Sequence, residues 1–163
     1  MRRSGALALL ALALAGCSLQ PMYAGGASGV VARELAAVEV PAIEGQAGWL
    51  VRAALMDRLG AAGQAAPRYR LDVRLDDRLE GLGVLSDDTV GRERRTLRAR
   101  YQLVDLADGT ILLDATAGSD AGIDVVSSEY ATIAAEQTAL ENLSKEVAAQ
   151  IATRIALALR ARE

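Results

Sequence analysis

The sequence predicts an α+β fold in which two helices pack on one face of a four-stranded, mainly antiparallel sheet, in the order β-α-β-β-β-α. Three patterns support this prediction. In residues 69–76 apolar and charged residues alternate strictly, which is typical of a strand with one buried face. Asp108-Gly109 separates two apolar runs and tolerates the positive φ of a tight hairpin turn. Residues 128–160 repeat large aliphatic side chains at helical spacing, which predicts a long amphipathic helix.

An edge strand and a helix are the first predicted elements. Val38, Val40 and Ile43 form a short apolar stretch that contains Pro41, and proline cannot donate to the ladder of a central strand. In residues 46–62 apolar side chains recur at spacings of three and four, which predicts an amphipathic helix. Its expected apolar stripe is Trp49, Leu50, Ala53, Met56 and Leu59, with Val51 and Leu55 beside it, and Gly60, Gly63 and Pro67 mark its end.

Three strands and a second helix complete the predicted domain. The first of these strands is 69–76, and the next is 96–106, with Leu97, Ala99, Tyr101 and Leu103 facing the core. A hairpin leads to a strand at 110–117, and a loop rich in Gly and Asp is expected at 118–124. The final helix is expected at 128–160, with Glu129 and Glu136 early and Arg154 and Arg160 late, as the helix dipole favours. Its expected buried stripe is Ile133, Leu140, Leu143, Val147, Ile151, Ile155 and Leu159.

The N-terminus has the pattern of an export signal. Arg2 and Arg3 precede an apolar run of residues 6–15, which is too short to span a membrane and matches the apolar part of a signal peptide. The run ends in Leu14-Ala15-Gly16-Cys17, which resembles the lipobox of bacterial lipoproteins. We therefore expect residues 1–16 to be removed and Cys17 to carry lipid, including acyl chains such as palmitate. Because Ser18 stands where an aspartate would signal retention, we expect sorting to the outer membrane, with the domain facing the periplasm.

Length and charge limit what the mature chain can be. After residues 1–16 are removed from the 163, the remainder has the size of one domain, which we expect at 38–163 behind a lipidated tether at 17–37. The tether contains the small-residue segment Ala-Gly-Gly-Ala-Ser-Gly at 24–29. The formal net charge of −3 becomes more negative once Arg2 and Arg3 are lost, which argues against nucleic acid as a partner.

Residues 17–23, Cys-Ser-Leu-Gln-Pro-Met-Tyr, resemble the Cys-to-Pro-x-Tyr start of the mature lipopolysaccharide-assembly lipoproteins. Residues 101–105, Tyr130-Ala131 and Ala135-Glu136 are similar to the second half of that family, particularly its alphaproteobacterial members. The resemblance implies a non-catalytic lipoprotein that assists assembly of the lipopolysaccharide-transport β-barrel of the outer membrane, plugs its lumen and contacts lipopolysaccharide. Its expected partners are that barrel protein, lipopolysaccharide and the membrane. The alternative function is an auxiliary lipoprotein of an envelope ABC system that transports lipid.

Catalytic and metal-binding patterns are weak in this sequence. It contains no histidine, the commonest general base and transition-metal ligand. Asp76-Asp77 and Asp87-Asp88 are expected at strand ends and loops as ordinary turn residues. Residues 81–83, Gly-Leu-Gly, lack the strand-to-helix context of a phosphate loop, and Ser127-Ser128 is expected to cap the last helix. We therefore expect no enzymatic activity, no cofactor and no metal.

Five arginines lie close together, at Arg92, Arg94, Arg95, Arg98 and Arg100. The first three are expected in the loop between the second and third strands, where they would contact phosphates of lipopolysaccharide, because a guanidinium binds phosphate through two hydrogen bonds. Arg98 and Arg100 are expected on the outward face of the third strand. For these two, pairing with Asp72 and Asp76 across the strands is an equally good interpretation.

Overall fold

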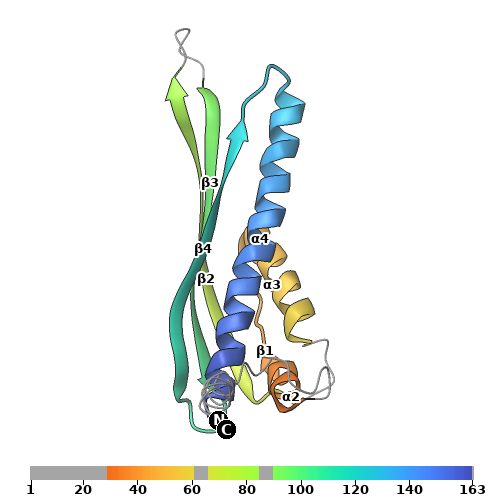
Figure 1. The fold of residues 1–163 in the computed structure, drawn as a ribbon, viewed down its shortest axis with the longest axis vertical. Coiled ribbons are helices and arrows are strands. Elements are labelled where there is room, and N and C mark those ends of the chain that lie inside the picture. The colour runs from red at the N-terminus through yellow and green to blue at the C-terminus, as the bar shows by residue number, and fades with distance from the viewer. Residues whose placement is uncertain (1–28, 61–65, 85–89, 163) are drawn as a thin grey trace, which may run out of the picture.

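The computed structural model describes residues 29–60, 66–84 and 90–162. The expected signal peptide, Cys17, the motif at 17–23 and Asp87-Asp88 lie outside the described residues. Figure 1 shows an elongated domain in which one long helix runs beside a long, twisted sheet. The elements, in chain order, are α2 (Val30–Ala36), β1 (Val38–Glu39), α3 (Gly45–Leu59), β2 (Tyr69–Val84), β3 (Val90–Asp105), β4 (Ile111–Asp124) and α4 (Glu129–Arg160).

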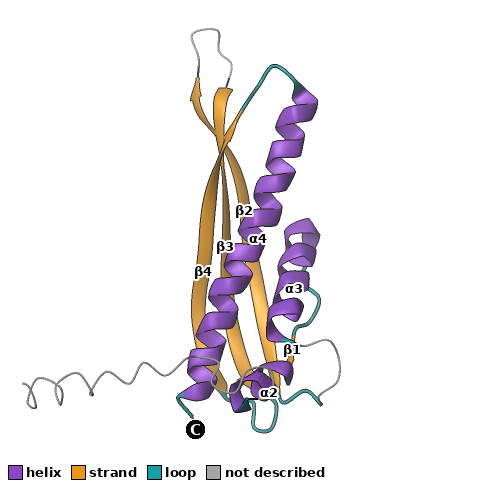
Figure 2. Ribbon diagram, turned by 45° about the vertical axis from the view of Figure 1, so that its right-hand side comes forward, coloured by secondary structure: helices purple, strands orange, loops and turns teal. Residues whose placement is uncertain are grey.

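The sheet has four strands in the order β1-β2-β3-β4, which confirms the α+β prediction. β1 is a two-residue edge strand parallel to β2, and the other neighbours are antiparallel. The Asp108-Gly109 turn joins β3 to β4 as expected, with Gly109 at φ +75° and its N–H donating to the carbonyl oxygen of Asp105. The three described helices, α2, α3 and α4, lie on one side of the sheet, so no described helix covers its other face (Figure 2).

The core lies between the inner face of the sheet and one stripe of α4. Leu97, Ala99, Tyr101 and Leu103 are buried, which confirms the inward face predicted for this strand. The α4 side chains that face them from residue 140 onward are also buried as predicted, namely Leu140, Leu143, Val147, Ile151, Ile155 and Leu159. Ser128 caps α4, since its side chain accepts a hydrogen bond from the N–H of Ala131.

Ile133 was predicted to be buried but is 54% exposed. Figure 2 shows α3 beside the half of α4 nearer its C-terminus, so of the described helices none packs on the first turns of α4.

The predicted stripe of α3 is wrong in orientation. Trp49 is 68% exposed and the buried face is turned toward Ala47 and Gly48, while Leu59 and the flanking Val51 and Leu55 are buried as expected. A Cβ at Gly48 would collide with the carbonyl group of Ile43, so this close contact sets which face turns inward. Both faces carry apolar residues, and periodicity alone did not distinguish them. The helix ends at Leu59, where Gly60 adopts a left-handed conformation at φ +68°.

The long strands extend well beyond their predicted ends. β2 and β3 continue in register to the pair Val84 and Val90, and β3 pairs with β4 as far as Arg92 and Asp124. Asp76-Asp77 and residues 118–124 are therefore strand, although turns and a loop were predicted. Asp and Gly disfavour strands locally, but neighbours with a matching register supply the ladder hydrogen bonds that outweigh this preference.

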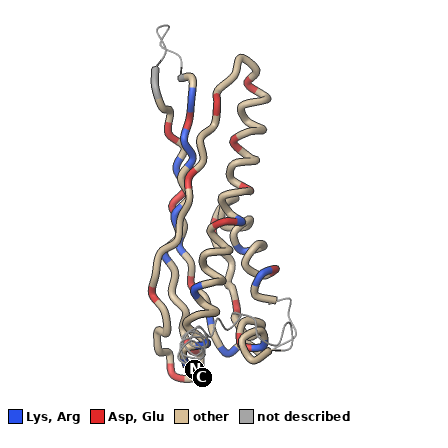
Figure 3. The backbone as a smooth tube through the Cα atoms, viewed as in Figure 1, with Lys and Arg blue, Asp and Glu red and all other residues tan. Residues whose placement is uncertain are grey.

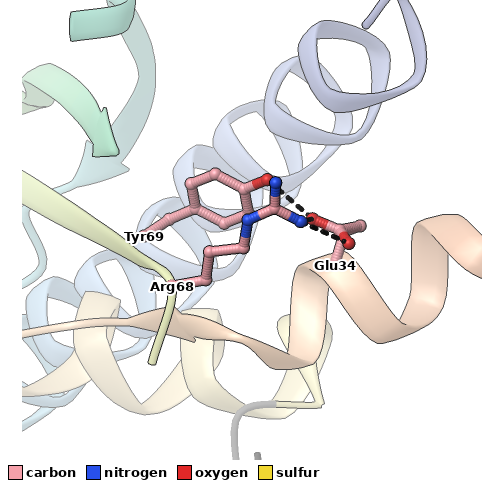
Figure 4. A network of polar contacts seen from close by, with 3 residues as sticks. All are labelled: Glu34, Arg68 and Tyr69. Atoms are coloured by element: carbon pink, nitrogen blue, oxygen red, sulfur yellow. Dashed lines mark hydrogen bonds and ion pairs between the residues drawn. The ribbon is translucent and has the colours of Figure 1, made fainter. Parts of the chain in front are cut away.

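A helix that was not predicted, α2, precedes the edge strand. Its Leu35 is buried in the core, and Glu34 accepts hydrogen bonds from Arg68 Nη1 at 3.0 Å and from the Tyr69 hydroxyl at 2.6 Å (Figure 4). Burial and the neighbouring Glu34 carboxylate raise the pKa of Tyr69 to about 12. This network joins α2 to the first residue of β2.

The fold predicts a large difference between two isoleucines of α4. Ile151→Ala should lower the free energy of unfolding by about 2–5 kcal/mol, because Ile151 is fully buried and its removal leaves a cavity. Ile133→Ala is the matched control and should cost under about 0.5 kcal/mol, since its side chain is mostly exposed. Chemical denaturation of the full chain measures both, and equal losses would contradict the described packing of α4.

Candidate functional site: the open face of the sheet

The face of the sheet that carries no helix is lined by charged side chains. Figure 3 shows basic and acidic residues following one another along β2 and β3. On this face the outward residues of β2 are Arg70, Asp72, Arg74, Asp76, Arg78 and Glu80. Those of β3 include Arg92, Arg94, Arg98, Arg100 and Gln102, and those of β4 include Asp114, Asp120 and Asp124. An open antiparallel sheet face is normally polar in this way.

Most of these charges are paired with a neighbour. Arg70 pairs with Asp72 at 2.9 Å and Arg78 with Asp76 at 2.9 Å, both within β2. Arg100 pairs with Asp114 of β4 at 3.2 Å. The predicted pairing of Arg98 and Arg100 with Asp72 and Asp76 is therefore not formed. These pairs are exposed to solvent, so each contributes little to the stability of the fold.

The three arginines predicted in a loop are in β3, and each already has a carboxylate neighbour. Arg92 Nε lies 3.0 Å from Asp124, and Arg94 Nε lies 4.0 Å from Asp120. The prediction failed because β2 and β3 pair beyond their apolar segments, so this stretch is not a loop. Arg92 and Arg94 still lie on the open face, but Arg95 points to the other side.

Arg95 is a structural residue between the sheet and α4. Its side chain is 16% exposed, and it donates to Asp77 through Nε at 2.9 Å and Nη2 at 2.7 Å. Its Nη1 donates to the main-chain oxygen of Glu136 in α4 at 3.2 Å. The hydrogen bonds with Asp77 raise the pKa of Arg95. This geometry leaves Arg95 poorly placed to bind an external anion.

Three further arginines lie on the open face nearer its middle, and we call Arg74, Arg98 and Arg100 the arginine cluster. Of these three, Arg100 is paired with Asp114. Arg74 lies directly opposite Arg100, and Arg98 occupies the next outward position of β3. Within the part of the chain that the structure describes, Arg74 and Arg98 form no ion pair. Like charges placed opposite each other on a sheet are destabilising. An anion bound between them would remove that repulsion, so this cluster is the candidate functional site.

The surface around the arginine cluster is shaped by β4 and α4. The cluster borders a pocket of about 630 Å³ that is also lined by Gly118, Gln150 and Arg154. A Cβ at Gly118 would collide with the side chain of Arg98, so the glycine lets the Arg98 stem lie flat across the sheet. Sequence reasoning placed Gly118 in a loop and missed this contact. Arg74, at an ordinary alternating position of β2, offered no separate signal.

α4 also closes the free edge of β4 beside this pocket. The Gln150 side chain accepts from the Gly118 N–H and donates to the Gly118 carbonyl, both at 3.2 Å. Arg154 Nη1 donates to the Thr116 carbonyl at 2.9 Å. These side chains satisfy main-chain groups that an edge strand would otherwise expose.

The described residues offer little for catalysis or metal binding. Asp76 and Asp77 point to opposite faces of the sheet, so they do not form an acid–base pair. Among residues 29–60, 66–84 and 90–162, no group of three or more acidic, cysteine or histidine residues could hold a metal ion. In the same ranges, no helix has the length and apolar character needed to cross a membrane.

One family model matches this chain. The model of the lipopolysaccharide-assembly family, LptE, matches residues 35–155. A candidate lipoprotein from Caulobacter crescentus has a similar structure, with a TM-score of 0.68 and 25% identity over 83% of this chain and 98% of its own. A minor lipoprotein from Acinetobacter baumannii has a TM-score of 0.57 and 17% identity, over 74% of this chain and 88% of its own. At its low identity it supports the fold alone. No curated protein matches the sequence significantly.

The contrast between Arg95 and Arg92 is open to a direct test. Arg95→Gln should lower the free energy of unfolding by about 1–3 kcal/mol, because it leaves the half-buried Asp77 without its hydrogen-bonding partner. Arg92→Gln removes an exposed ion pair and should cost under about 0.5 kcal/mol. Denaturation curves of both variants measure the two losses. A loss at Arg92 as large as that at Arg95 would refute the structural role of Arg95.

Proposed function

Since this chain belongs to the lipopolysaccharide-assembly family, we propose that it is an outer-membrane lipoprotein that assists assembly of the lipopolysaccharide-transport β-barrel, plugs its lumen and contacts lipopolysaccharide. The family match over residues 35–155 carries this proposal, and it favours the assembly role over an auxiliary role in an ABC lipid-transport system.

The proposed membrane anchor is Cys17. It is the only cysteine of the chain and follows the lipobox-like residues at 14–16. Each buried methylene of an attached acyl chain adds about 0.8 kcal/mol of membrane affinity, so two or more chains hold a protein stably at a bilayer. The proposed location is the periplasmic side of the outer membrane.

The shape and polarity of the domain support the proposed role as a plug. The 32 residues of α4 correspond to about 48 Å of helix, enough to run the height of a barrel in a bilayer. The lumen of such a barrel is polar. The open sheet face is charged rather than apolar, so it can line a wet interface without leaving apolar surface in water.

The arginine cluster supports the proposed contact with lipopolysaccharide. Lipopolysaccharide carries anionic groups, and a guanidinium binds phosphate or carboxylate through two hydrogen bonds. Among the described residues Arg74 and Arg98 form no ion pair, although Arg98 lies opposite Asp76 in the sheet register, whereas Arg92 and Arg94 pair with Asp124 and Asp120. We therefore assign the first contact to the cluster, with Arg92 and Arg94 as a weaker extension along the same face.

The anchor and partner assignments predict one purification result. The full chain, purified from detergent-solubilised outer membranes, should copurify with a β-barrel protein in a stable complex. Cys17→Ser should leave unprocessed precursor in the inner membrane, because a hydroxyl cannot replace the thiol that accepts the lipid. Immunoblotting of separated membranes, with mass spectrometry of the copurified proteins, measures both results. Recovery of the Cys17→Ser variant in the outer membrane, or purification without a barrel, would contradict the proposal.

The ligand assignment predicts a difference between two double variants. Arg74→Gln with Arg98→Gln should weaken binding of purified lipopolysaccharide by about tenfold or more, since each charge-assisted contact contributes about 1.5–3 kcal/mol when desolvated. Arg92→Gln with Arg94→Gln is the matched control on the same face and should weaken binding less. Binding is measured at two salt concentrations, and the dependence of affinity on salt should fall in the first variant. Equal affinity of the first variant and wild type at low salt would exclude the cluster as the contact.

A further inference from the structure

The two edges of the sheet differ in how far the rest of the described chain covers them. α4 covers the edge of β4 through Gln150 and Arg154. On the other side, β1 pairs with β2 only at Tyr69 and Arg70. In the described residues, no strand pairs with this side of β2 from Leu71 to Val84. β2 therefore offers a long row of main-chain donors and acceptors to another strand.

The chain after β1 leaves this edge accessible. Pro41 has no N–H to donate, and Pro41, Ala42 and Ile43 are separated from β2 by a pocket of about 560 Å³ that is lined on the strand side by residues 71–74. Figure 2 shows α3 beside the half of β2 nearer Tyr69 only. The other half of the edge has no helix of its own next to it.

The inner face of β2 is also incompletely covered along this edge. Leu71 is fully buried, but Val73 and Leu75 are only half-buried, and Leu79 is 42% exposed. These residues continue the apolar row of the core beyond the helices that cover it. A strand added at this edge would bring further apolar side chains beside them.

The charges on the outward face of β2 identify which strand fits. From residue 70 to residue 80 the outward residues alternate between basic and acidic, beginning with Arg70 and ending with Glu80. When a strand with this alternation pairs antiparallel with a second copy of itself, each basic residue can lie opposite an acidic one. Two antiparallel copies related by a two-fold axis at Leu75 place opposite charges opposite each other throughout, namely Arg70 with Glu80, Asp72 with Arg78 and Arg74 with Asp76.

The same register suits the inner face. It places Leu75 beside Leu75 of the second copy and Leu71 beside the exposed Leu79. Val73 meets Asp77, whose carboxylate remains hydrogen-bonded to Arg95. The antiparallel arrangement also sets the half of β2 that lacks α3 beside the α3-bearing half of the other copy, so the two helices do not compete for one space.

From the open edge, the half-covered apolar row and the self-complementary charges, we infer that two copies of this chain associate through β2 into one continuous antiparallel sheet. The contact is isologous, with the same strand on both sides. It goes beyond the proposed function and does not rest on it, although the two share Arg74, which the dimer places opposite Asp76 of the second copy.

Disulfide trapping tests the axis of the dimer. In the full chain with Cys17→Ser, the introduced thiol is the only one, so a disulfide can form only between two copies. Leu75→Cys should give a cross-linked dimer under mild oxidation, because a residue on the axis meets itself. Leu79→Cys is the matched control on the same strand and face. It is more exposed but faces residue 71, so it should cross-link less. Stronger cross-linking at residue 79 than at 75, or none at either, would overturn the inferred register.

Charge exchange tests the association without cysteines. In analytical ultracentrifugation of the full chain in detergent, wild type should dimerise reversibly at concentrations up to about 100 µM. Arg78→Asp should weaken the dimer by about tenfold, because it sets an aspartate opposite Asp72 of the other copy at both symmetry-related positions. Adding Asp72→Arg to that variant should restore dimerisation. A monomeric wild type, or a second substitution that gives no rescue in a variant with an unaltered unfolding curve, would overturn the inference. Barrel copurification tests the proposed function separately.

Discussion

The whole structure depends on the burial of one stripe of α4 against the inner face of a single sheet. Leu143, Val147, Ile151 and Ile155 pack against side chains such as Leu97 and Leu103, and none of the described helices covers the other side of the sheet. The chain has no phenylalanine and few other aromatic residues, so this contact is built from aliphatic side chains at many positions. A long helix and long strands are the way to accumulate enough buried apolar area from such small units.

A one-sided sheet necessarily leaves a second face in water, and here that face carries charge in a pattern. Most arginines lie beside an acidic residue, as on ordinary solvated surfaces. The exceptions are Arg74 and Arg98, which form no ion pair among the described residues. β2 and β3 place Arg74 opposite Arg100, and Gly118 gives Arg98 room. The repulsion there is tolerated by the fold and can be relieved by an anion. This connects the architecture to the proposed contact with lipopolysaccharide.

The same one-sided design leaves two sheet edges to be protected. α4 is long enough to reach the β4 edge, where Gln150 reproduces the hydrogen bonds of a missing strand at Gly118. β1 is too short to do the same for β2, because Pro41 ends its pairing. The charged side chains of β2 then determine which strands can pair with it. A strand whose basic and acidic residues lie opposite charges of the other sign is favoured, and a strand that places like charges opposite each other is disfavoured.

The sequence by itself determined the fold class, the hairpin at Asp108-Gly109, the inward row of β3 and most of the α4 stripe. These features follow from local periodicity. A strand or helix that buries one side and exposes the other repeats its apolar residues at a fixed spacing. It also carried the family resemblance, in the residues at 101–105 and at the start of α4. Only the tertiary structure decided the length of the strands, because Asp77, Arg95 and Gly118 are strand residues through pairing with neighbours distant in sequence. For the same reason it alone separated Arg95, held between Asp77 and α4, from the arginine cluster, since the surroundings of a charge depend on which strands and helices meet there.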